Sequence, residues 1–96
     1  MASYVILMNF TDQGARAASE SPQRAAAFKE DAAKLGVEVK SVYWTLGRYD
    51  VVLTLEGSEE AVAGAMMKVA ELGNVHTQTL RAFTADELGR ITGKAS

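Results

Sequence analysis

The stretch that decides the fold reads Val42-Tyr43-Trp44-Thr45-Leu46-Gly47-Arg48-Tyr49-Asp50-Val51-Val52-Leu53. Two runs rich in β-branched and aromatic residues meet there, which predicts a β-hairpin. Gly47-Arg48 fits a two-residue hairpin loop, because a type II′ turn needs a positive φ at its first position and glycine adopts it at little cost. This turn would pair Leu46 with Tyr49, and the pairing would continue outward along both strands.

Alternation along the strands divides the side chains of the hairpin between two faces. The first face is apolar throughout, and we expect it to pack under helices; it comprises Val42, Trp44, Leu46, Tyr49, Val51, Leu53 and Leu55. The second face is mixed and carries the only carboxylate in the middle of the hairpin; it comprises Ser41, Tyr43, Thr45, Asp50, Val52 and Thr54.

The rest of the chain supplies strands and helices in alternation. The predicted strands cover residues 4–10, 37–46, 49–56 and 75–83, and the predicted helices begin at Ser21-Pro22, at Ser58 and at the capping box of Thr84 and Glu87. The charged residues of the first helix are interpreted as a solvated face; they are Arg24, Lys29, Glu30, Asp31 and Lys34. The order β-α-β-β-α-β with a short terminal helix predicts an α+β, ferredoxin-like fold, with a four-stranded antiparallel sheet and both helices on one face.

Composition limits the classes of protein that fit. The 96 residues suffice for a single domain over residues 1–96. The chain has 10 Lys and Arg against 12 Asp and Glu, with no long block of either sign, so a nucleic-acid partner is disfavoured. No apolar run is long enough to span a bilayer, and the first residues lack the positive charge of a signal peptide. The absence of cysteine excludes disulfides and thiolate chemistry. These features predict a cytoplasmic protein.

The uncovered face of the sheet predicts self-association. The strand at residues 4–10 is apolar on both faces, and Tyr43 and Val52 lie on the second face of the hairpin. A monomer would expose these side chains as one apolar patch. Burying a few hundred Å² of it at ~25 cal/mol per Å² would offset several kcal/mol of association cost. We therefore expect a homodimer or a ring of dimers, in which two sheets stack as a dimeric α+β barrel.

Candidate ligand-binding residues collect in and near the hairpin; they are Tyr43, Trp44, Arg48, Tyr49, Asp50 and His76. Asp50 could bind a ligand amine or act as a base, or it could accept hydrogen bonds that fix the turn. His76, the only histidine, could titrate near neutrality or simply form hydrogen bonds at an interface. Arg48 could bind an anionic group or form a surface ion pair with Asp50 or Glu56.

The sequence predicts neither a cofactor nor a metal site. His76 and Asp50 lack the ligand spacing that zinc or iron sites use, and no glycine-rich phosphate loop is present. Two hypotheses for function remain. One is an oligomeric module that binds a small molecule or another protein. The alternative is a cofactor-independent enzyme, similar to monooxygenases or isomerases, that would use Trp44, Tyr49 and His76 between the sheet and the helices.

The hairpin also resembles a known family. Gly47, Tyr49 and Asp50 match the signature for which the GYD-domain family of small bacterial proteins is named. The resemblance extends over residues 10–14 and 72–83, and thus over nearly the whole chain. It implies a dimeric, ferredoxin-like protein without a settled activity, and it transfers no catalytic residue.

A weaker likeness links residues 47–52 and 75–79 to the effector-binding domain of Lrp/AsnC-type regulators. In that family small ligands, often amino acids, lie at interfaces between subunits. The present chain carries no helix-turn-helix domain, so the likeness does not extend to direct contact with DNA.

Overall fold

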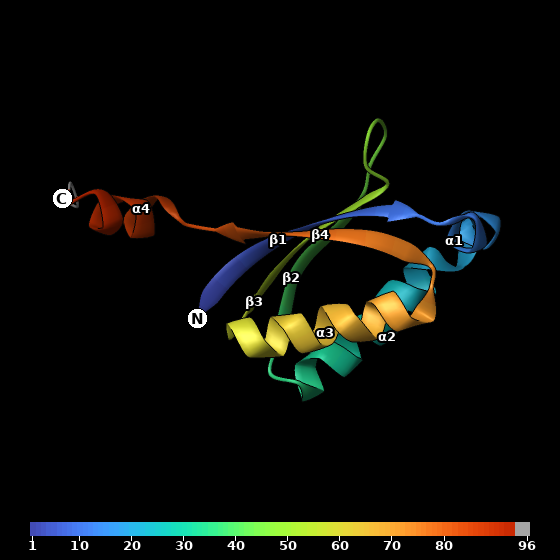
Figure 1. Ribbon diagram of the computed structural model, residues 1–96, viewed down its shortest axis with the longest axis horizontal. Coiled ribbons are helices and arrows are strands. Elements are labelled where there is room, and N and C mark those ends of the chain that lie inside the picture. The colour runs from blue at the N-terminus through green and yellow to red at the C-terminus, as the bar shows by residue number, and fades with distance from the viewer. Residues whose placement is uncertain (94–96) are drawn as a thin grey trace.

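The computed structural model describes residues 1–93. In chain order its elements are β1 (Ala2–Phe10), α1 (Asp12–Arg16), a 3₁₀ turn (Ala18–Glu20), α2 (Ser21–Lys34), β2 (Glu38–Trp44), β3 (Val51–Gly57), α3 (Glu59–Leu72), β4 (Val75–Ala82) and α4 (Ala85–Thr92). The strands form one antiparallel sheet in the order β2-β3-β1-β4, and α2 and α3 lie together on one side of it (Figure 1). This arrangement is the predicted ferredoxin-like fold.

The starts of α3 and α4 follow the caps that the sequence predicts, whereas α2 begins at Ser21 itself, with Glu20 as its N-cap and no side-chain capping hydrogen bond. The Ser58 hydroxyl accepts a hydrogen bond from the Ala61 N–H at 3.1 Å and starts α3. At α4 the Thr84 hydroxyl accepts from the Glu87 N–H, and the Glu87 carboxylate accepts from the Thr84 N–H at 2.8 Å. That backbone hydrogen bond is the main reason why the pKa of the exposed Glu87 carboxyl lies below its usual range.

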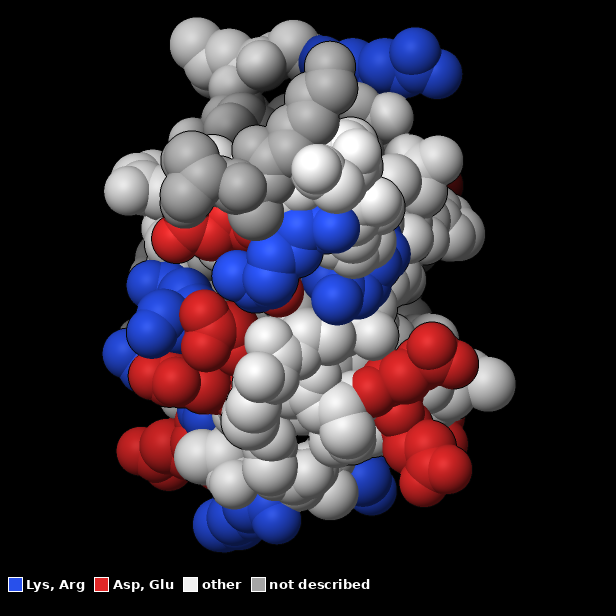
Figure 2. Space-filling model, turned by 90° about the vertical axis from the view of Figure 1, so that its left-hand side faces the viewer, with Lys and Arg blue, Asp and Glu red and all other residues white. Residues whose placement is uncertain are grey.

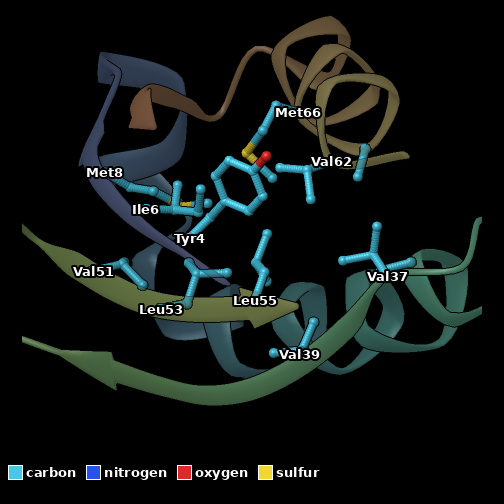
Figure 3. Packing of buried hydrophobic residues seen from close by; sticks show 12 residues of the cluster. Tyr4, Ile6, Met8, Val37, Val39, Val51, Leu53, Leu55, Val62 and Met66 are labelled. Atoms are coloured by element: carbon cyan, nitrogen blue, oxygen red, sulfur yellow. The ribbon is translucent and has the colours of Figure 1, made fainter. Parts of the chain in front are cut away.

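The core lies between the helices and one face of the two central strands. Tyr4, Ile6 and Met8 of β1 point to the same side as the buried side chains of β3, and Val62 and Met66 of α3 close over them (Figure 3). The β3 residues of this layer are Val51, Leu53 and Leu55. Ile6 and Leu55 are fully inaccessible to solvent. The helical side of the sheet is therefore the closed side of the molecule.

A β-bulge in β2 keeps its apolar residues on the helical side. Val39 pairs with Leu55 and Ser41 with Thr54, so Lys40 is an extra residue without a partner in β3. Strict alternation would turn Val39 and Val42 to opposite faces. The bulge restores both to the helical side, where Val39 is buried and Val42 packs against the core.

The hairpin has the predicted register but a longer loop. Trp44 pairs with Val51, and Gly47 has the positive φ that the predicted turn requires. The strands end there, however, and residues 45–50 form a loop that stands away from α2 and α3 (Figure 1). Asp50 at the end of this loop bonds to both neighbouring strands: its carbonyl accepts the Thr45 N–H at 2.9 Å, and its N–H donates to the Met8 carbonyl at 2.9 Å. We call residues 45–50 the GYD loop.

The C-terminal helix α4 lies beyond one end of the sheet, apart from α2 and α3 (Figure 1). Its apolar side chains Leu88 and Ile91 are exposed, as is Phe83 in the segment that leads to it. The Arg81 guanidinium covers the Phe83 ring at 4.3 Å from the ring centre. This end of the molecule thus presents apolar surface that the described residues do not cover.

Gly14 offers a test of how α1 is fixed to the sheet. A Cβ atom at this position would overlap the carbonyl oxygen of Asn74, which accepts the Thr11 N–H at 3.0 Å. We expect Gly14→Ala to lower the free energy of unfolding by at least about 2 kcal/mol in urea denaturation. Gly64→Ala is the matched control: it meets open space on α3 and should raise stability by up to about 1 kcal/mol. Equal effects of the two substitutions would contradict this packing.

Candidate functional site

The GYD loop is attached to the end of β1 by hydrogen bonds. The Asp50 carboxylate accepts the Phe10 N–H at 2.8 Å, and the Asn9 side-chain amide donates to the Arg48 carbonyl at 2.7 Å. Within the loop, the Thr45 hydroxyl donates to the Tyr49 carbonyl at 2.6 Å. The Asp50 carboxylate thus accepts a backbone hydrogen bond, as the structural alternative for this residue predicts.

Tyr49 lies on the side opposite to the one predicted. Its hydroxyl donates to the Gln78 side-chain oxygen at 3.2 Å, and Gln78 pairs with Leu7 on the face away from the helices. The prediction that Tyr49 shares the apolar face with Trp44 is therefore wrong. Leu46 was predicted on that face too, but it is fully exposed in the GYD loop. Both errors come from extending strand alternation into residues that belong to the loop.

The face of the sheet away from the helices is here called the open face. Strand register assigns to it Ser3, Val5, Leu7 and Asn9 of β1, Glu38, Ser41 and Tyr43 of β2, Val52, Thr54 and Glu56 of β3, and His76, Gln78, Leu80 and Ala82 of β4. Val5, Leu7 and Val52 form its half-buried apolar centre, with Tyr43 66% and Leu80 44% exposed at its margins. No helix among residues 1–93 covers this face (Figure 1).

His76 belongs to the open face, where it is exposed and lies opposite Asn9. In β4, His76 and Gln78 lie on the same side of the sheet as Tyr49, while Thr77 and Thr79 point to the helical side. Tyr43, Tyr49 and His76 accordingly share one side of the sheet.

Trp44 lies on the helical side, as predicted, but it is not closed in the core. Its indole N–H donates to the Ser21 hydroxyl at 2.9 Å, at the start of α2, and the residue is 45% exposed. The ring borders a cavity of about 80 Å³ between the sheet and the two helices. Other walls of this cavity are formed by Met8, Phe28 and Leu72.

Arg24 is a residue of this site that the sequence analysis assigned to a solvated face. Instead it is half-buried and lines the cavity, and its Nη1 donates to the Ala17 carbonyl at 2.9 Å. Its Nη2 is buried and has no hydrogen-bond partner among the described residues. Arg24 follows Ser21 by one helical turn and therefore lies on the same side of α2. The burial of Ser21 depends on tertiary packing, so helical spacing alone did not predict that this side of the helix is buried.

The remaining candidate, Arg48, lies exposed in the GYD loop, with its guanidinium 5.8 Å from the centre of the Tyr49 ring. The predicted ion pair with Asp50 is absent within residues 1–93, where the side-chain ion pair found joins Lys40 and Glu38 at 3.3 Å. The carboxylate of Asp50 is directed to the backbone of β1 instead.

The predicted residues therefore do not converge on one pocket. Trp44 faces the cavity on the helical side, whereas Tyr49 and His76 lie on the other side of the sheet. Within residues 1–93 no cluster of three or more His, Cys, Asp or Glu residues could hold a metal ion. In the same range no helix is long and apolar enough to cross a membrane. At the end that carries α4, side chains of both charge signs are interspersed (Figure 2).

The fold defines a ferredoxin-like α+β protein. Its GYD loop contacts the open face through the hydrogen bond between Tyr49 and Gln78. The sequence model of the GYD domain matches residues 4–92, and the chain belongs to this family. It is 35% identical over 94 residues to the glutamine synthetase and cystathionine beta-lyase binding protein of Thermus thermophilus; the match covers 95% of this chain and 99% of the relative. The crystal structure of FFRP-DM1 has the same fold, with a TM-score of 0.63, 22% identity, and coverage of 86% of this chain and all of that one.

The attachment of the GYD loop can be tested at Asp50. Asp50→Ala removes the acceptor of the Phe10 N–H, so we expect the free energy of unfolding to fall by about 1.5 kcal/mol or more. Asp50→Asn retains an acceptor oxygen and should cost about half as much or less. Urea denaturation of both variants beside the wild type measures the difference, and an unchanged midpoint for Asp50→Ala would refute the structural role.

Proposed function

We propose that this protein is a one-domain, cytoplasmic interaction module that self-associates through its open face and binds a metabolic enzyme and a small ligand. The observation that carries the proposal is the uncovered apolar centre of the open face. An antiparallel sheet can leave one face in water, but an apolar centre on that face is stabilised when another surface covers it. Within residues 1–93 the chain does not supply that cover, so the natural source is a second copy.

The composition of the open face suits a copy of itself. Its centre is uncharged, and serine, threonine, asparagine and glutamine side chains surround the apolar residues. The carboxylates of Glu56 and its register partner Glu38 lie at one end, at the height of Ser3. Two such faces can meet without bringing like charges together at the centre, and an apolar centre within a polar rim is the usual anatomy of a protein interface.

The relative from Thermus thermophilus supports an enzyme as the protein partner. Its name states that it binds glutamine synthetase and cystathionine beta-lyase, and the match covers nearly the whole length of both chains. Glutamine synthetase is therefore the first partner to test for the present chain. The fully exposed Leu46 in the GYD loop is an apolar contact that such a partner could cover.

The alternative, a cofactor-independent enzyme, has weaker support. It requires Trp44, Tyr49 and His76 to act on one substrate between the sheet and the helices. Tyr49 and His76 lie on the open face, on the other side of the sheet from the cavity that Trp44 borders. A backbone layer thus separates the residues that this mechanism would need together.

Self-association is testable with two neighbouring substitutions in β4. Leu80→Lys puts a charge on the open face, and Thr79→Lys puts the same charge on the helical side at an exposed position of the same strand. We expect light scattering to give a dimer or larger assembly for the wild type and Thr79→Lys, and a folded monomer for Leu80→Lys. A wild-type monomer at micromolar concentration, or equal masses for both variants, would contradict the proposed interface.

Enzyme binding is tested separately. Glutamine synthetase and cystathionine beta-lyase from the organism that encodes this chain are immobilised. Binding of the chain to each enzyme is followed by interferometry. We expect saturable binding to at least one of them, and weaker binding of Leu80→Lys because a monomer presents only one copy of the contact surface. Thr79→Lys should bind like the wild type. An absence of binding to both enzymes at micromolar concentration would refute this part of the proposal.

A further inference from the structure

We infer that α4 of one copy binds in the groove between α2 and α3 of another copy, and that this contact joins dimers into a larger assembly. The inference rests on the self-association in the proposed function and adds a second contact to it. The surfaces that it uses are α4 and the outer side of the two helices, which are separate from the open face, so each contact can be broken alone.

The helix α4 has an apolar side that the described part of the chain leaves uncovered. Leu88 and Ile91 are three residues apart, which places them on the same side of the helix, and they are 52% and 63% exposed. By the same helical spacing, Asp86 and Arg90 lie on the opposite side. A short amphipathic helix of this kind is stabilised mainly by packing of its apolar side, so it gains free energy when another surface covers Leu88 and Ile91.

A groove of matching character lies between α2 and α3. We call it the helix groove; its lining residues belong to α2 and α3 and to Leu35, which follows α2, so it opens away from the sheet. The buried Ala32 and Ala65 form its floor, and Phe28, Leu35 and Leu72 form apolar walls. Its volume of about 350 Å³ is roughly twice the ~150 Å³ that accommodates benzene in an engineered cavity. Two aliphatic side chains of the size of leucine therefore fit into it.

The edges of the helix groove carry charges of both signs. Arg24 and Asp31 of α2 and Lys68 and Glu71 of α3 border it, so the rim is neutral overall. An apolar floor within a charged rim is the form of groove that binds the apolar side of an amphipathic helix. The charges of α4 are also of both signs, so the rim accepts this helix without net repulsion.

The helix α4 cannot fill the groove of its own chain. Two residues, Phe83 and Thr84, connect β4 to α4, and they span at most about 7 Å. A helix with its side chains is roughly 10–12 Å thick, so this connection is too short to carry α4 past α3 to the outer side of the helices. Accordingly, α4 lies beyond the end of the sheet, apart from α2 and α3 (Figure 1).

A second copy of the chain is the occupant that covers both surfaces. Every copy brings one α4 and one helix groove, so pairing between copies leaves neither uncovered. In a dimer formed through the open faces, the two helical layers lie on the outside, and α4 would have to pass around the whole partner to reach its groove. The contact therefore forms between dimers. Because it joins two different surfaces, it produces a ring where the geometry closes.

The contact is small, and its size decides how the assembly behaves. A helix of eight residues covers less than the ~1,200 Å² at the lower limit of stable interfaces, so one such contact holds two monomers only weakly. An open-face dimer carries an α4 and a groove on each of its copies, so a closed assembly uses several contacts at once and gains from effective concentration. Loss of the open-face dimer should therefore disperse the larger assembly as well.

Two pairs of substitutions test the contact from both sides. Leu88→Lys puts a charge on the apolar side of α4, and Asp86→Asn changes the net charge by the same amount on the opposite side. Ala27→Lys puts a charge into the helix groove, and Ala26→Lys puts the same charge on the next position, outside the groove. All of these positions are exposed, so each melting temperature should stay within about 4 °C of the wild type.

Native mass spectrometry and light scattering, at tens of micromolar, give the mass of each assembly. We expect an even-numbered assembly larger than a dimer for the wild type, Asp86→Asn and Ala26→Lys. Leu88→Lys and Ala27→Lys should give dimers, because a buried charge without a partner opposes the contact. A wild type that stops at the dimer, or a wild-type mass for either Leu88→Lys or Ala27→Lys, would overturn the inference.

The same measurements separate this inference from the proposed function. A dimer for all of these proteins beside a monomer for Leu80→Lys would retain the open-face interface and overturn the α4 contact alone. A wild-type mass for Leu80→Lys beside a monomer for Leu88→Lys would overturn the open-face interface and retain the α4 contact. If Leu88→Lys keeps the wild-type mass but loses binding to glutamine synthetase, the enzyme covers α4 and the inference is wrong.

Discussion

Two hydrogen bonds join the backbone at the end of β1 to Asp50, one through its N–H and one through its carboxylate, and they fix the GYD loop relative to the sheet. The Asp50 N–H donates to the Met8 carbonyl, and the Asp50 carboxylate accepts the Phe10 N–H. They attach the end of the GYD loop to the central strand β1, while the Asp50 carbonyl still accepts the Thr45 N–H across the hairpin. Tyr49 is thereby carried to the open face, while Trp44, before the loop, stays on the helical side. The family signature thus acts as an anchor for a loop.

The sheet separates two environments that differ in what they can bind. The helical side holds the core and, at its end near Trp44, a small cavity with a cation and a hydroxyl in otherwise apolar walls. The open face is broad, uncharged at its centre and flanked by the GYD loop, which suits contact with another protein. The two sides of one four-stranded sheet therefore differ in shape and in chemistry.

Local chemistry made much of the fold predictable. The capping box of Thr84 and Glu87 and the positive φ of Gly47 depend on neighbouring residues alone, and both were read correctly from the sequence. The strand order followed from the element pattern. The side of Tyr49 was not predictable, because it depends on bonds between the loop and β1, about forty residues earlier in the chain. The role of Arg24 was hidden for a similar reason, since a charged residue on a helix is usually solvated and only packing against the sheet buries its Nη2.

The bulge at Lys40 has a consequence for how copies of this chain can add to one another. β2 is an edge strand, and a regular edge with free backbone groups invites further strands to join without limit, as in fibres. The extra residue interrupts the even spacing of those groups. The same part of the edge strand carries the charged side chains of Glu38 and Lys40. Growth of the sheet in its own plane is thereby discouraged at this edge. The proposed contact between copies through the open face would instead close on itself and stop at a defined size.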